Sequence, residues 1–269
     1  MNEDAAPTVD PYQRIADLYD LEHDEFRDDI DLLLQFAEGV EGPILELGCG
    51  SGRILAPMAE VGLTVVGMDT SEAMLARART RIASANLGGR VTLVAGDMTD
   101  ATIAPGGPFS LVVFSLNALM HLDTPVRQLE ALRNARRVLA SHGQLIIDLV
   151  NPTPDYLVSL AAGPALEGSW VLDDNSIVDK LTTRTISACD QTIGATIWYD
   201  ILAPDGQLVR LRTHFELRYL HRNELTLMLT DAGYGDIRVY GSYEMDPFDD
   251  ASDRMVVTAR PTQREVGVL

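Results

Sequence analysis

The 269-residue chain has few cysteines, few basic residues and no long apolar run. Two cysteines, Cys49 and Cys189, are too few for a disulfide framework, and no spacing of histidine, cysteine and carboxylate residues requires a metal ion. Lysine and arginine total 21 against 40 acidic residues, and the net charge of -19 argues against nucleic acid, whose phosphates need a basic surface. No segment approaches the ~20 apolar residues of a membrane span, and the acidic N-terminus lacks signal-peptide character. We therefore expect a cytoplasmic protein, without membrane contact, that acts on a small molecule.

The sequence does carry a glycine-rich loop between two apolar runs. Residues 44–53 have the sequence ILELGCGSGR, and a second apolar run, residues 64–69, ends in Asp69. With the helix-forming segment 54–60 between them, the runs predict a strand, a tight loop, a helix and a parallel strand. Glycines at alternate positions allow the loop to turn sharply and let a ligand approach backbone N–H groups. An acid at the end of the second strand can hold ribose hydroxyls, so the motif predicts a nucleotide-type cofactor site.

Two side chains separate this loop from a dinucleotide-binding loop. The G-x-G-x-x-G fingerprint has glycine or alanine where this chain has Arg53. Glu46, at the end of the first strand, would repel a pyrophosphate but suits a cation. S-adenosylmethionine is a ligand of that kind, since it carries an ammonium group and a sulfonium and has no phosphate. On these residues the chain resembles the class I S-adenosylmethionine-dependent methyltransferases.

The resemblance implies S-adenosylmethionine as cofactor and an in-line transfer of its methyl group to N or O of a small-molecule acceptor. Two alternatives stay open. One is a protein that binds the same cofactor without methyl transfer, as a sensor, a partner subunit or an aminopropyl transferase. The other is an NAD-dependent oxidoreductase. The excess of acidic residues favours a neutral or cationic acceptor.

The resemblance also implies an α/β fold, a Rossmann-like seven-stranded sheet with helices on both faces. The residue patterns add a β-rich antiparallel insertion after the fifth strand. We expect N-terminal helices in 1–39, the methyltransferase core in 40–150 and 222–262, and a substrate lid or dimer element in 151–221. Later core strands are predicted at 90–95, 109–114, 145–150, 237–244 and 254–259, and helices at 15–35, 70–85, 125–138 and 222–232. The insertion is predicted to be a linker followed by strands at 176–188, 192–203 and 207–219.

In this family the glycine loop receives the methionine part of the cofactor, the second-strand acid receives the ribose, and an acid after the third strand meets the adenine amino group. Asp69 and Asp97 hold the last two positions in this chain. Cys49 is expected to fill the loop, and Thr70 or Ser71 to cap the next helix. Cofactor binding is assigned to Glu46, Gly48, Cys49, Gly50, Gly52, Arg53, Asp69, Thr70, Met74, Gly96, Asp97, Met98, Ser115 and Leu116.

Within the family the chain is similar to deoxysugar N-methyltransferases and to relatives of glycine N-methyltransferase. The similarity lies in Tyr19-Asp20 near the N-terminus and in His121 after the fourth strand. We expect Tyr19 to close over the cofactor, and His121 to orient or deprotonate the acceptor, because an imidazole titrates near neutral pH. The alternatives are that His121 caps the following helix and that Tyr19 is ordinary helix core. Acceptor binding is assigned to Tyr12, Asn117 and Asn151.

Other charged residues are expected to lie mostly away from this site. The acidic run within residues 22–31 is predicted to be a solvated helix face, and His214 and His221 to lie on the surface of the insertion. Arg184 and Arg212 are the candidates to bind the carboxylate of a glycine-type acceptor. Because the insertion has edge strands that pairing with a second subunit would protect, we expect a homodimer.

Overall fold

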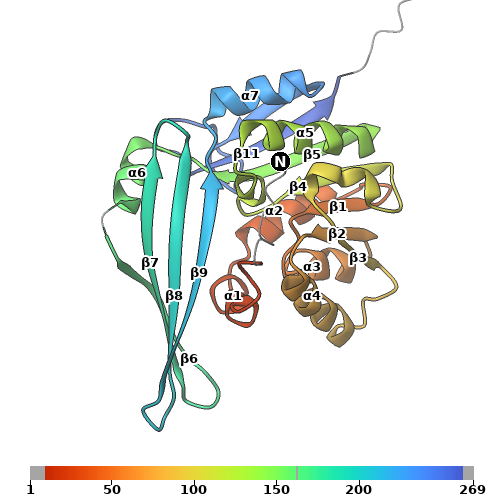
Figure 1. Ribbon diagram of the computed structural model, residues 1–269. Coiled ribbons are helices and arrows are strands. Elements are labelled where there is room, and N and C mark those ends of the chain that lie inside the picture. Colours follow the sequence, from red (N-terminus) through yellow and green to blue (C-terminus); the bar gives the residue numbers. More distant parts are fainter. Residues whose placement is uncertain (1–9, 162, 263–269) are drawn as a thin grey trace, which may run out of the picture.

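The computed structural model describes residues 10–161 and 163–262, and its main element is a seven-stranded sheet (Figure 1). The strand order across the sheet is β10-β11-β5-β4-β1-β2-β3. Strand β11 is antiparallel to both of its neighbours, whereas β1 to β5 pair in parallel. The strands are β1 (Ile44–Leu47), β2 (Val65–Asp69), β3 (Val91–Ala95), β4 (Phe109–Phe114), β5 (Leu139–Val150), β10 (Tyr234–Tyr240) and β11 (Arg254–Pro261). The predicted Rossmann-like seven-stranded sheet is confirmed.

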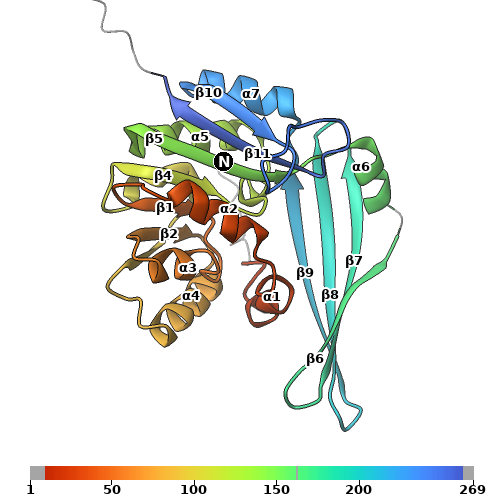
Figure 2. The same ribbon diagram turned by 180° about the vertical axis from the view of Figure 1, so that it is seen from behind.

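Helices cover both faces of this sheet, as the two opposite views show (Figures 1 and 2). On one face α5 (Pro125–Val138) and α7 (Arg222–Asp231) pack on a core that includes Leu45, Val112 and Ile147. On the other face α2 (Asp28–Ala37) and α3 (Leu55–Glu60) pack on the alternate residues of the same strands. All four residues of β1 are buried, as expected of a strand covered on both sides. The remaining helices are α1 (Ala16–His23), α4 (Glu72–Ser84) and α6 (Pro154–Leu160), with short 3-10 turns at Met98–Ile103 and Ala118–His121.

A separate antiparallel sheet of four strands stands beside this core. It consists of β6 (Ala165–Val171), β7 (Ile177–Ser187), β8 (Thr192–Leu202) and β9 (Leu208–Arg218), paired in that order. Helix α1 packs on its inner face, where Ile15 and Leu18 contact Val178, Tyr199 and Phe215 in one apolar cluster. In Figure 1 the far end of this sheet projects beyond α1. A hairpin turn, in which the Gly206 N–H donates to the Ala203 carbonyl oxygen, joins β8 to β9.

The segment between the two sheets differs from its prediction. It was expected to be a linker, but it contains helix α6 and strand β6. The Thr153 side chain accepts a hydrogen bond from the Tyr156 N–H and so caps α6. Helix α6 buries none of its residues, and β6 is largely exposed. Neither element therefore produces the apolar periodicity on which the prediction depended.

Several boundaries also differ from their predictions. Strand β5 begins at Leu139 and not at 145, because a register shift opposite Phe109 lets the expected turn residues continue the ladder. Strand β10 covers Tyr234–Tyr240 in place of 237–244, since buried Tyr234 already pairs with Pro261. The N-terminal segment forms two helices, α1 and α2. Across residues 10–161 and 163–262, none of the helices has both the length and the apolar character that a membrane crossing requires.

Candidate active site

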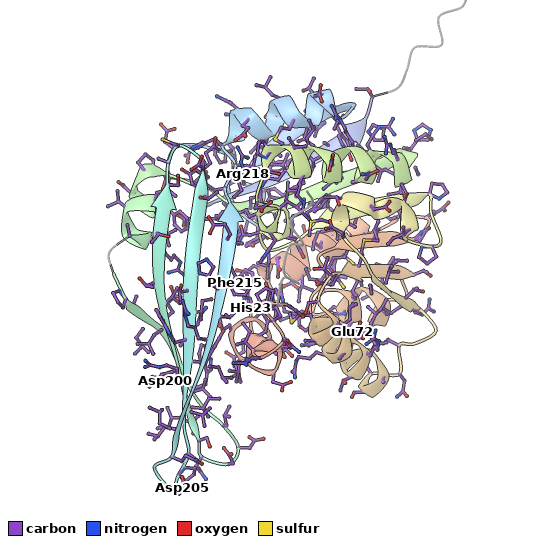
Figure 3. All side chains as sticks on the ribbon, viewed as in Figure 1. His23, Glu72, Asp200, Asp205, Phe215 and Arg218 are labelled. Carbon is purple, nitrogen blue, oxygen red and sulfur yellow. The ribbon has the colours of Figure 1, made fainter. Side chains whose placement is uncertain are left out.

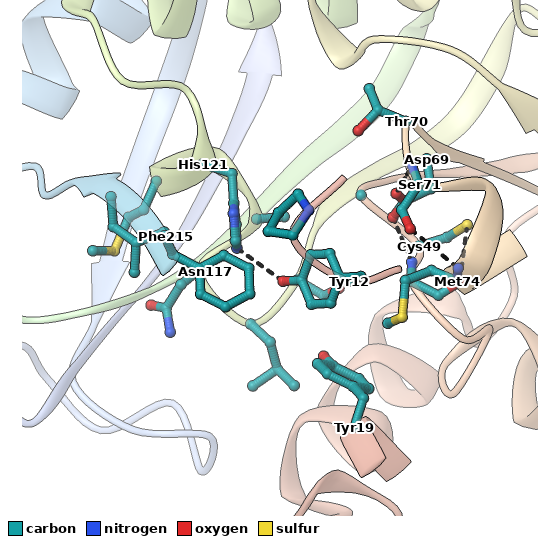
Figure 4. Close-up of a pocket in the computed structure, with 18 of the residues that line it drawn as sticks. Tyr12, Tyr19, Cys49, Asp69, Thr70, Ser71, Met74, Asn117, His121 and Phe215 are labelled. Atoms are coloured by element: carbon teal, nitrogen blue, oxygen red, sulfur yellow. Dashed lines mark hydrogen bonds between the residues drawn. The ribbon is translucent and has the colours of Figure 1, made fainter. Parts of the chain in front are cut away.

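The candidate site is a cavity of about 620 Å³ at the carboxyl ends of β1, β2 and β4. Its walls come from the glycine loop, the N-terminal segment before α1, the turn after β4 and the inner face of the antiparallel sheet. The volume falls within the range of about 300–1,000 Å³ that is usual for small-molecule sites. Figure 4 shows part of this lining, with Asp69 and Met74 on one side and His121 and Phe215 on the other.

The glycine loop folds back tightly on β2 and packs against the turn after β4. The N–H groups of Gly48 and Cys49 both donate to the Met68 carbonyl oxygen, at 2.8 and 3.0 Å. Gly48 has a φ of +80°, and a Cβ there would lie 2.8 Å from the Ala118 Cβ. Cys49 is a buried free thiol whose pKa is raised by burial, in agreement with the expected filling role. Gly48, Cys49 and Gly50 all line the cavity.

Glu46 brings a buried carboxyl group to the same wall. Its Oε1 atom accepts a hydrogen bond from the Ser115 hydroxyl at 2.6 Å, and its Oε2 atom has no partner among the described residues. Burial raises the pKa of Glu46 to about 8. A buried oxygen without a partner is costly unless a ligand satisfies it. An ammonium group would do so, and Glu46 therefore fits the cation expected from the sequence.

Asp69 is fixed at the end of β2 by the backbone around it. The N–H groups of Gly50 and Ser71 donate to its two carboxylate oxygens, each at 2.8 Å. Burial raises the pKa of Asp69. Of the two candidates, Ser71 is the residue that caps α4, accepting from the Met74 N–H at 3.2 Å. The remaining lone pairs of the Asp69 carboxylate can accept hydrogen bonds from a ribose.

Asp97 lies where the third strand ends, beside Gly96 and Met98 on the cavity wall. Its carboxylate accepts from the Thr99 N–H at 2.8 Å and from Arg127 at 2.7 Å. Burial alone would raise the pKa of Asp97, but the Thr99 and Arg127 contacts outweigh it and lower that pKa. Asp97 is thus an ionised acceptor at neutral pH, with Arg127 as its partner before any ligand arrives.

The opposite wall is aromatic. The Tyr12 hydroxyl lies 3.4 Å from Nε2 of His121, and the ring centroids of Tyr12 and His121 lie 5.0 and 5.8 Å from that of Phe215. Tyr19 stacks on His23 with a centroid separation of 4.1 Å. His121 is exposed to the cavity itself, and enclosure by the surrounding walls lowers its pKa to about 4. The His121 imidazole is therefore neutral at pH 7.

Most of the residues assigned from the sequence meet at this cavity, but Gly52 and Asn151 do not line it. Gly52 faces α4, where a Cβ would lie 3.2 Å from the Ala78 Cβ. The Asn151 side chain donates to the Ser252 carbonyl oxygen at 2.8 Å. Arg53 does line the cavity, although its guanidinium is bound to Asp29 and the Phe26 carbonyl. The assigned residues that line it are Tyr12, Tyr19, Glu46, Gly48, Cys49, Gly50, Arg53, Asp69, Thr70, Met74, Gly96, Asp97, Met98, Ser115, Leu116, Asn117 and His121.

The prediction that the acidic run within residues 22–31 is a solvated face is wrong for two of its members. Asp29 is buried and forms an ion pair with Arg53. Glu22 accepts hydrogen bonds from Lys180 at 2.6 Å and from Tyr199 at 2.5 Å, and so joins α1 to the antiparallel sheet. Sequence periodicity does not reveal that Asp29 will meet a cation 24 residues away, or Glu22 one 158 residues away.

The inner face of the antiparallel sheet supplies further lining residues, of which only Arg184 was a candidate from the sequence. Arg184 lines the cavity and pairs with Glu167 at 2.5 Å, whereas Arg212 is exposed and lies outside it. The alternation of strand residues places one set on a common face, but the sequence does not say which face meets the cavity. The set comprises Lys180, Arg184, Ile193, Ala195, Ile197, Tyr199, Phe215 and Leu217. Figure 3 labels Phe215 and His23 between this sheet and the core.

Comparison with known proteins gives a methyltransferase domain over residues 44–143. The putative methyltransferase YqeM of Bacillus subtilis is 31% identical over 51% of this chain and 55% of its own length. The cypemycin N-terminal methyltransferase of a Streptomyces species is 27% identical over 80% of this chain and 81% of its own. Among solved structures, the CcbJ methyltransferase of Streptomyces caelestis superposes with a TM-score of 0.74 at 26% identity, covering 94% of this chain and 98% of its own. The chain thus spans about half of YqeM and most of the other two. Similarity to these proteins gives no support to the two alternatives, an NAD-dependent oxidoreductase and a protein that binds the cofactor without methyl transfer.

Proposed function

We propose that this chain, which belongs to the S-adenosylmethionine-dependent methyltransferase family, transfers the methyl group of that cofactor to an amine nitrogen of a small molecule. The observation that carries the proposal is the Glu46 Oε2 atom, which has no partner among the residues that the structure describes and lies beside a glycine loop whose Gly50 N–H donates to Asp69. A cationic ligand with a ribose matches both groups. A dinucleotide would bring its phosphates close to the Glu46 carboxylate, and the two negative charges would repel each other.

The cofactor would be held along one wall of the cavity. In this proposal Glu46 binds the ammonium group, the loop at Gly48 and Gly50 accommodates the methionine part, and Asp69 accepts from the ribose hydroxyls. Asp97 lies near the adenine. When bound, S-adenosylmethionine supplies a methyl group on a positively charged sulfur that is a good leaving group. The task left to the protein is to hold both reactants in line, which is worth about 7–11 kcal/mol.

His121 is the observation that favours nitrogen over oxygen. An alcohol needs a base with a pKa near neutral, which typically contributes a factor of ~10²–10⁴, whereas a neutral amine already has a free lone pair. The pKa of His121 is lowered to about 4, so its imidazole is a poor proton acceptor at pH 7. We therefore assign His121 and Tyr12 to orienting the acceptor. The cypemycin enzyme, named for an N-terminal methyl transfer, matches this chain across the antiparallel sheet as well as the core.

The proposal extends to the organisation of the chain. Residues 151–221 would act as a substrate lid over a core formed by 40–150 and 222–262, with the N-terminal helices completing the cavity. The net charge of -19 favours a neutral or cationic acceptor. A homodimer formed through the edge strands of the antiparallel sheet and a cytoplasmic location complete the proposal. Within the described part of the chain Cys49 and Cys189 are free thiols, as is usual in a reducing compartment. Light scattering of the full chain tests the dimer.

The cofactor assignment is tested by thermal unfolding with S-adenosylhomocysteine, NAD⁺ or NADH. A ligand at a hundred times its Kd stabilises the native state by about 2.7 kcal/mol, which raises the Tm by a few degrees in a chain of this size. We expect a shift with S-adenosylhomocysteine alone. A shift with NAD⁺ alone would refute the methyltransferase proposal.

The acceptor assignment is tested by measuring S-adenosylhomocysteine release from S-adenosylmethionine with matched amines and alcohols. We expect turnover with amines, and about a tenfold lower kcat in His121→Gln with unchanged S-adenosylhomocysteine affinity, because an orienting contact is lost. Faster turnover of the alcohols would contradict the nitrogen assignment. An unchanged kcat in His121→Gln would remove His121 from the reaction.

A further inference from the structure

The turn that follows β4 has an unusual backbone. Leu116 has a φ of 40° and Asn117 a φ of 65°, so two consecutive residues other than glycine lie in the left-handed region. Such a conformation is unfavourable, more so for leucine than for asparagine, and it persists only where the surroundings enforce it. Both residues line the cavity. The strain therefore lies in the wall of the site.

One residue of the neighbouring strand holds this turn. The Leu116 N–H donates to Oδ2 of Asp148 at 3.2 Å, and the Asn117 N–H donates to the Asp148 carbonyl oxygen at 2.9 Å. The Asn117 side chain closes the arrangement, because its Oδ1 accepts from the Val150 N–H at 2.7 Å. Asp148 thus fixes both left-handed residues, once through its side chain and once through its backbone.

Asp148 is itself held from the side away from the cavity. The Arg254 Nε donates to Oδ1 of Asp148 at 2.8 Å, and the Tyr243 hydroxyl donates to Oδ2 at 2.9 Å. The Arg254 guanidinium also lies over the Tyr243 ring, 5.0 Å from its centroid. Asp148 is buried, and the lining of the cavity includes none of these three side chains. Any effect they have on a ligand must pass through the turn.

The turn leads directly to the cation-binding carboxyl group. Its first residue, Ser115, donates its hydroxyl hydrogen to Oε1 of Glu46 at 2.6 Å and leaves Oε2 without a partner among residues 10–161 and 163–262. A displaced turn would move the Ser115 hydroxyl and with it the orientation of Glu46. The path from Asp148 to Glu46 thus consists of one strained turn and one hydrogen bond.

We propose that Asp148, held by Tyr243 and Arg254, is a positioning residue that locks the 115–117 turn so that Glu46 presents its free oxygen to the ammonium group of the cofactor. This inference rests on the proposed function, because it assumes that the Glu46 wall receives the methionine part. A positioning role predicts different effects on two parts of the ligand, whereas a general loss of stability would weaken the binding of both parts. Loss of Asp148 should weaken recognition of the amino acid portion and leave recognition of the adenosine portion largely intact.

The test is calorimetric titration with two probes, S-adenosylhomocysteine and 5′-methylthioadenosine, which share adenosine and a thioether but differ in the amino acid portion. In Asp148→Asn we expect S-adenosylhomocysteine to bind about tenfold more weakly, the effect of losing one charge-assisted hydrogen bond, and 5′-methylthioadenosine to bind within about threefold of wild type. Tyr243→Phe removes one hydroxyl outside the cavity and should show the same selectivity to a smaller degree. Tyr234→Phe is the matched control, since its buried hydroxyl donates to the Leu132 carbonyl on the far side of the core.

A double-mutant cycle with Leu116→Gly tests the role of the strain. Glycine adopts a positive φ at little cost, so the turn should depend less on its clamp. We expect the Asp148→Asn substitution to weaken S-adenosylhomocysteine binding by less in the Leu116→Gly background than in wild type. Additive effects would contradict the proposal.

The remaining outcomes separate this inference from the proposed function. If Asp148→Asn does not fold, Tyr243→Phe decides by the same comparison of probes. Equal weakening of both probes in a folded variant, or no weakening, would overturn the positioning role alone. A wild-type protein that binds neither probe would overturn the proposed function and this inference with it.

Discussion

The two walls of the cavity are built in different ways. One wall, which we propose binds the cofactor and call the cofactor wall, comes largely from residues 46–98, which lie close in sequence at the ends of neighbouring parallel strands, with Asp69 held by backbone N–H groups. The other wall, proposed to bind the acceptor, is called the acceptor wall. The acceptor wall joins Tyr12, His121 and Phe215, of which the first two are 109 residues apart in the chain. The first wall is specified by a local motif, and the second by how separate elements pack. We therefore expect single substitutions to change the affinity for the cofactor more than the affinity for the acceptor.

Burial shows the same contrast. Val112 in β4 is fully buried between helices, whereas the outer face of the antiparallel sheet exposes Val171 by 71% of its surface. Val171, Ile177, Leu202 and Leu208 lie in one row across that face, through successive paired positions. In Figure 3 the labelled residue Asp205 lies at the projecting end of this sheet, and Arg218 lies at the opposite end. One face of the antiparallel sheet thus contributes to the site and the other contributes little to the core.

The largest expected effect is on the cofactor wall, at Asp69. Asp69→Ala removes the acceptor for the Gly50 and Ser71 N–H groups together with the proposed ribose contact. We expect S-adenosylhomocysteine to bind about a hundredfold more weakly, since hydrogen bonds to charged groups contribute about 1.5–3 kcal/mol each. Calorimetric titration measures this change. Asp205→Ala, in the exposed hairpin turn, is the control and should bind as wild type does; equal affinities in both variants would show that Asp69 is not a ligand.

The glycine loop allows a sharper test, because two glycines share a backbone conformation but differ in their surroundings. Gly48 and Gly62 have φ values of +80° and +96°, but only at Gly48 would a Cβ meet another atom, the Ala118 Cβ at 2.8 Å. Gly62→Ala should cost about 1 kcal/mol for the backbone alone, and Gly48→Ala about 3 kcal/mol because overpacking adds to it. Urea unfolding measures both. Equal costs would mean that the loop relaxes away from the β4 turn.

The cofactor wall was predictable from the sequence for the same reason that these glycines matter. Residues 44–69 form one strand-loop-helix-strand unit, so glycine spacing and the two acids specify a site within a single motif. The seven-stranded sheet followed from the family resemblance, and buried apolar runs predicted its individual strands. The acceptor wall was predictable only in part. His121, Tyr12 and the candidate Arg184 could be named from the sequence, but Phe215 and the Glu22–Lys180 pair depend on how the antiparallel sheet packs on α1.

The contacts of Asp148 with Tyr243 and Arg254 show another limit of prediction. Asp148, Tyr243 and Arg254 are ordinary strand and loop residues in the sequence, and only the antiparallel pairing of β5 with β11 brings Arg254 beside Asp148. Helix α6 and strand β6 were missed because they bury little and carry no periodic apolar signal. Sequence patterns are a good guide to which residues are buried, but a poor guide to which polar groups contact one another.

A smaller effect is expected from pH acting on Glu46. Burial raises its pKa to about 8, so the carboxyl is largely protonated at pH 6 and ionised above pH 8. The ammonium group requires the ionised form. S-adenosylhomocysteine affinity should therefore rise by up to about tenfold per pH unit from pH 6 and level off above about pH 8. Glu46→Gln should flatten this dependence, whereas a flat profile in the wild-type protein would show that Glu46 does not meet the cation.

For the protein without ligand, the raised pKa of Glu46 makes stability fall with rising pH, which is the opposite of its effect on ligand affinity. Because the pKa of Glu46 is higher in the folded than in the unfolded state, its contribution to stability is fully present below about pH 4.5 and is lost as pH rises through about 8. Ligand should therefore stabilise the protein most at the upper end of this window. Urea unfolding at pH 6 and pH 8, with and without S-adenosylhomocysteine, measures the difference.

The smallest effect tests the contrast between the sheets with one substitution made twice. Val112→Thr places a hydroxyl in the fully buried centre of the core and should cost about 1–3 kcal/mol, because that hydroxyl loses water without a prepared partner. Val171→Thr makes the same change on the exposed face of β6 and should stay within about 0.5 kcal/mol of wild type. Urea unfolding of both variants, at the same protein concentration, gives the comparison. A loss of more than about 1 kcal/mol at Val171 would show that this face is covered in solution, since an exposed threonine has no reason to destabilise a strand. If that loss also grows as the protein is concentrated, the cover is a second copy of the chain, and the antiparallel sheet has two buried faces after all.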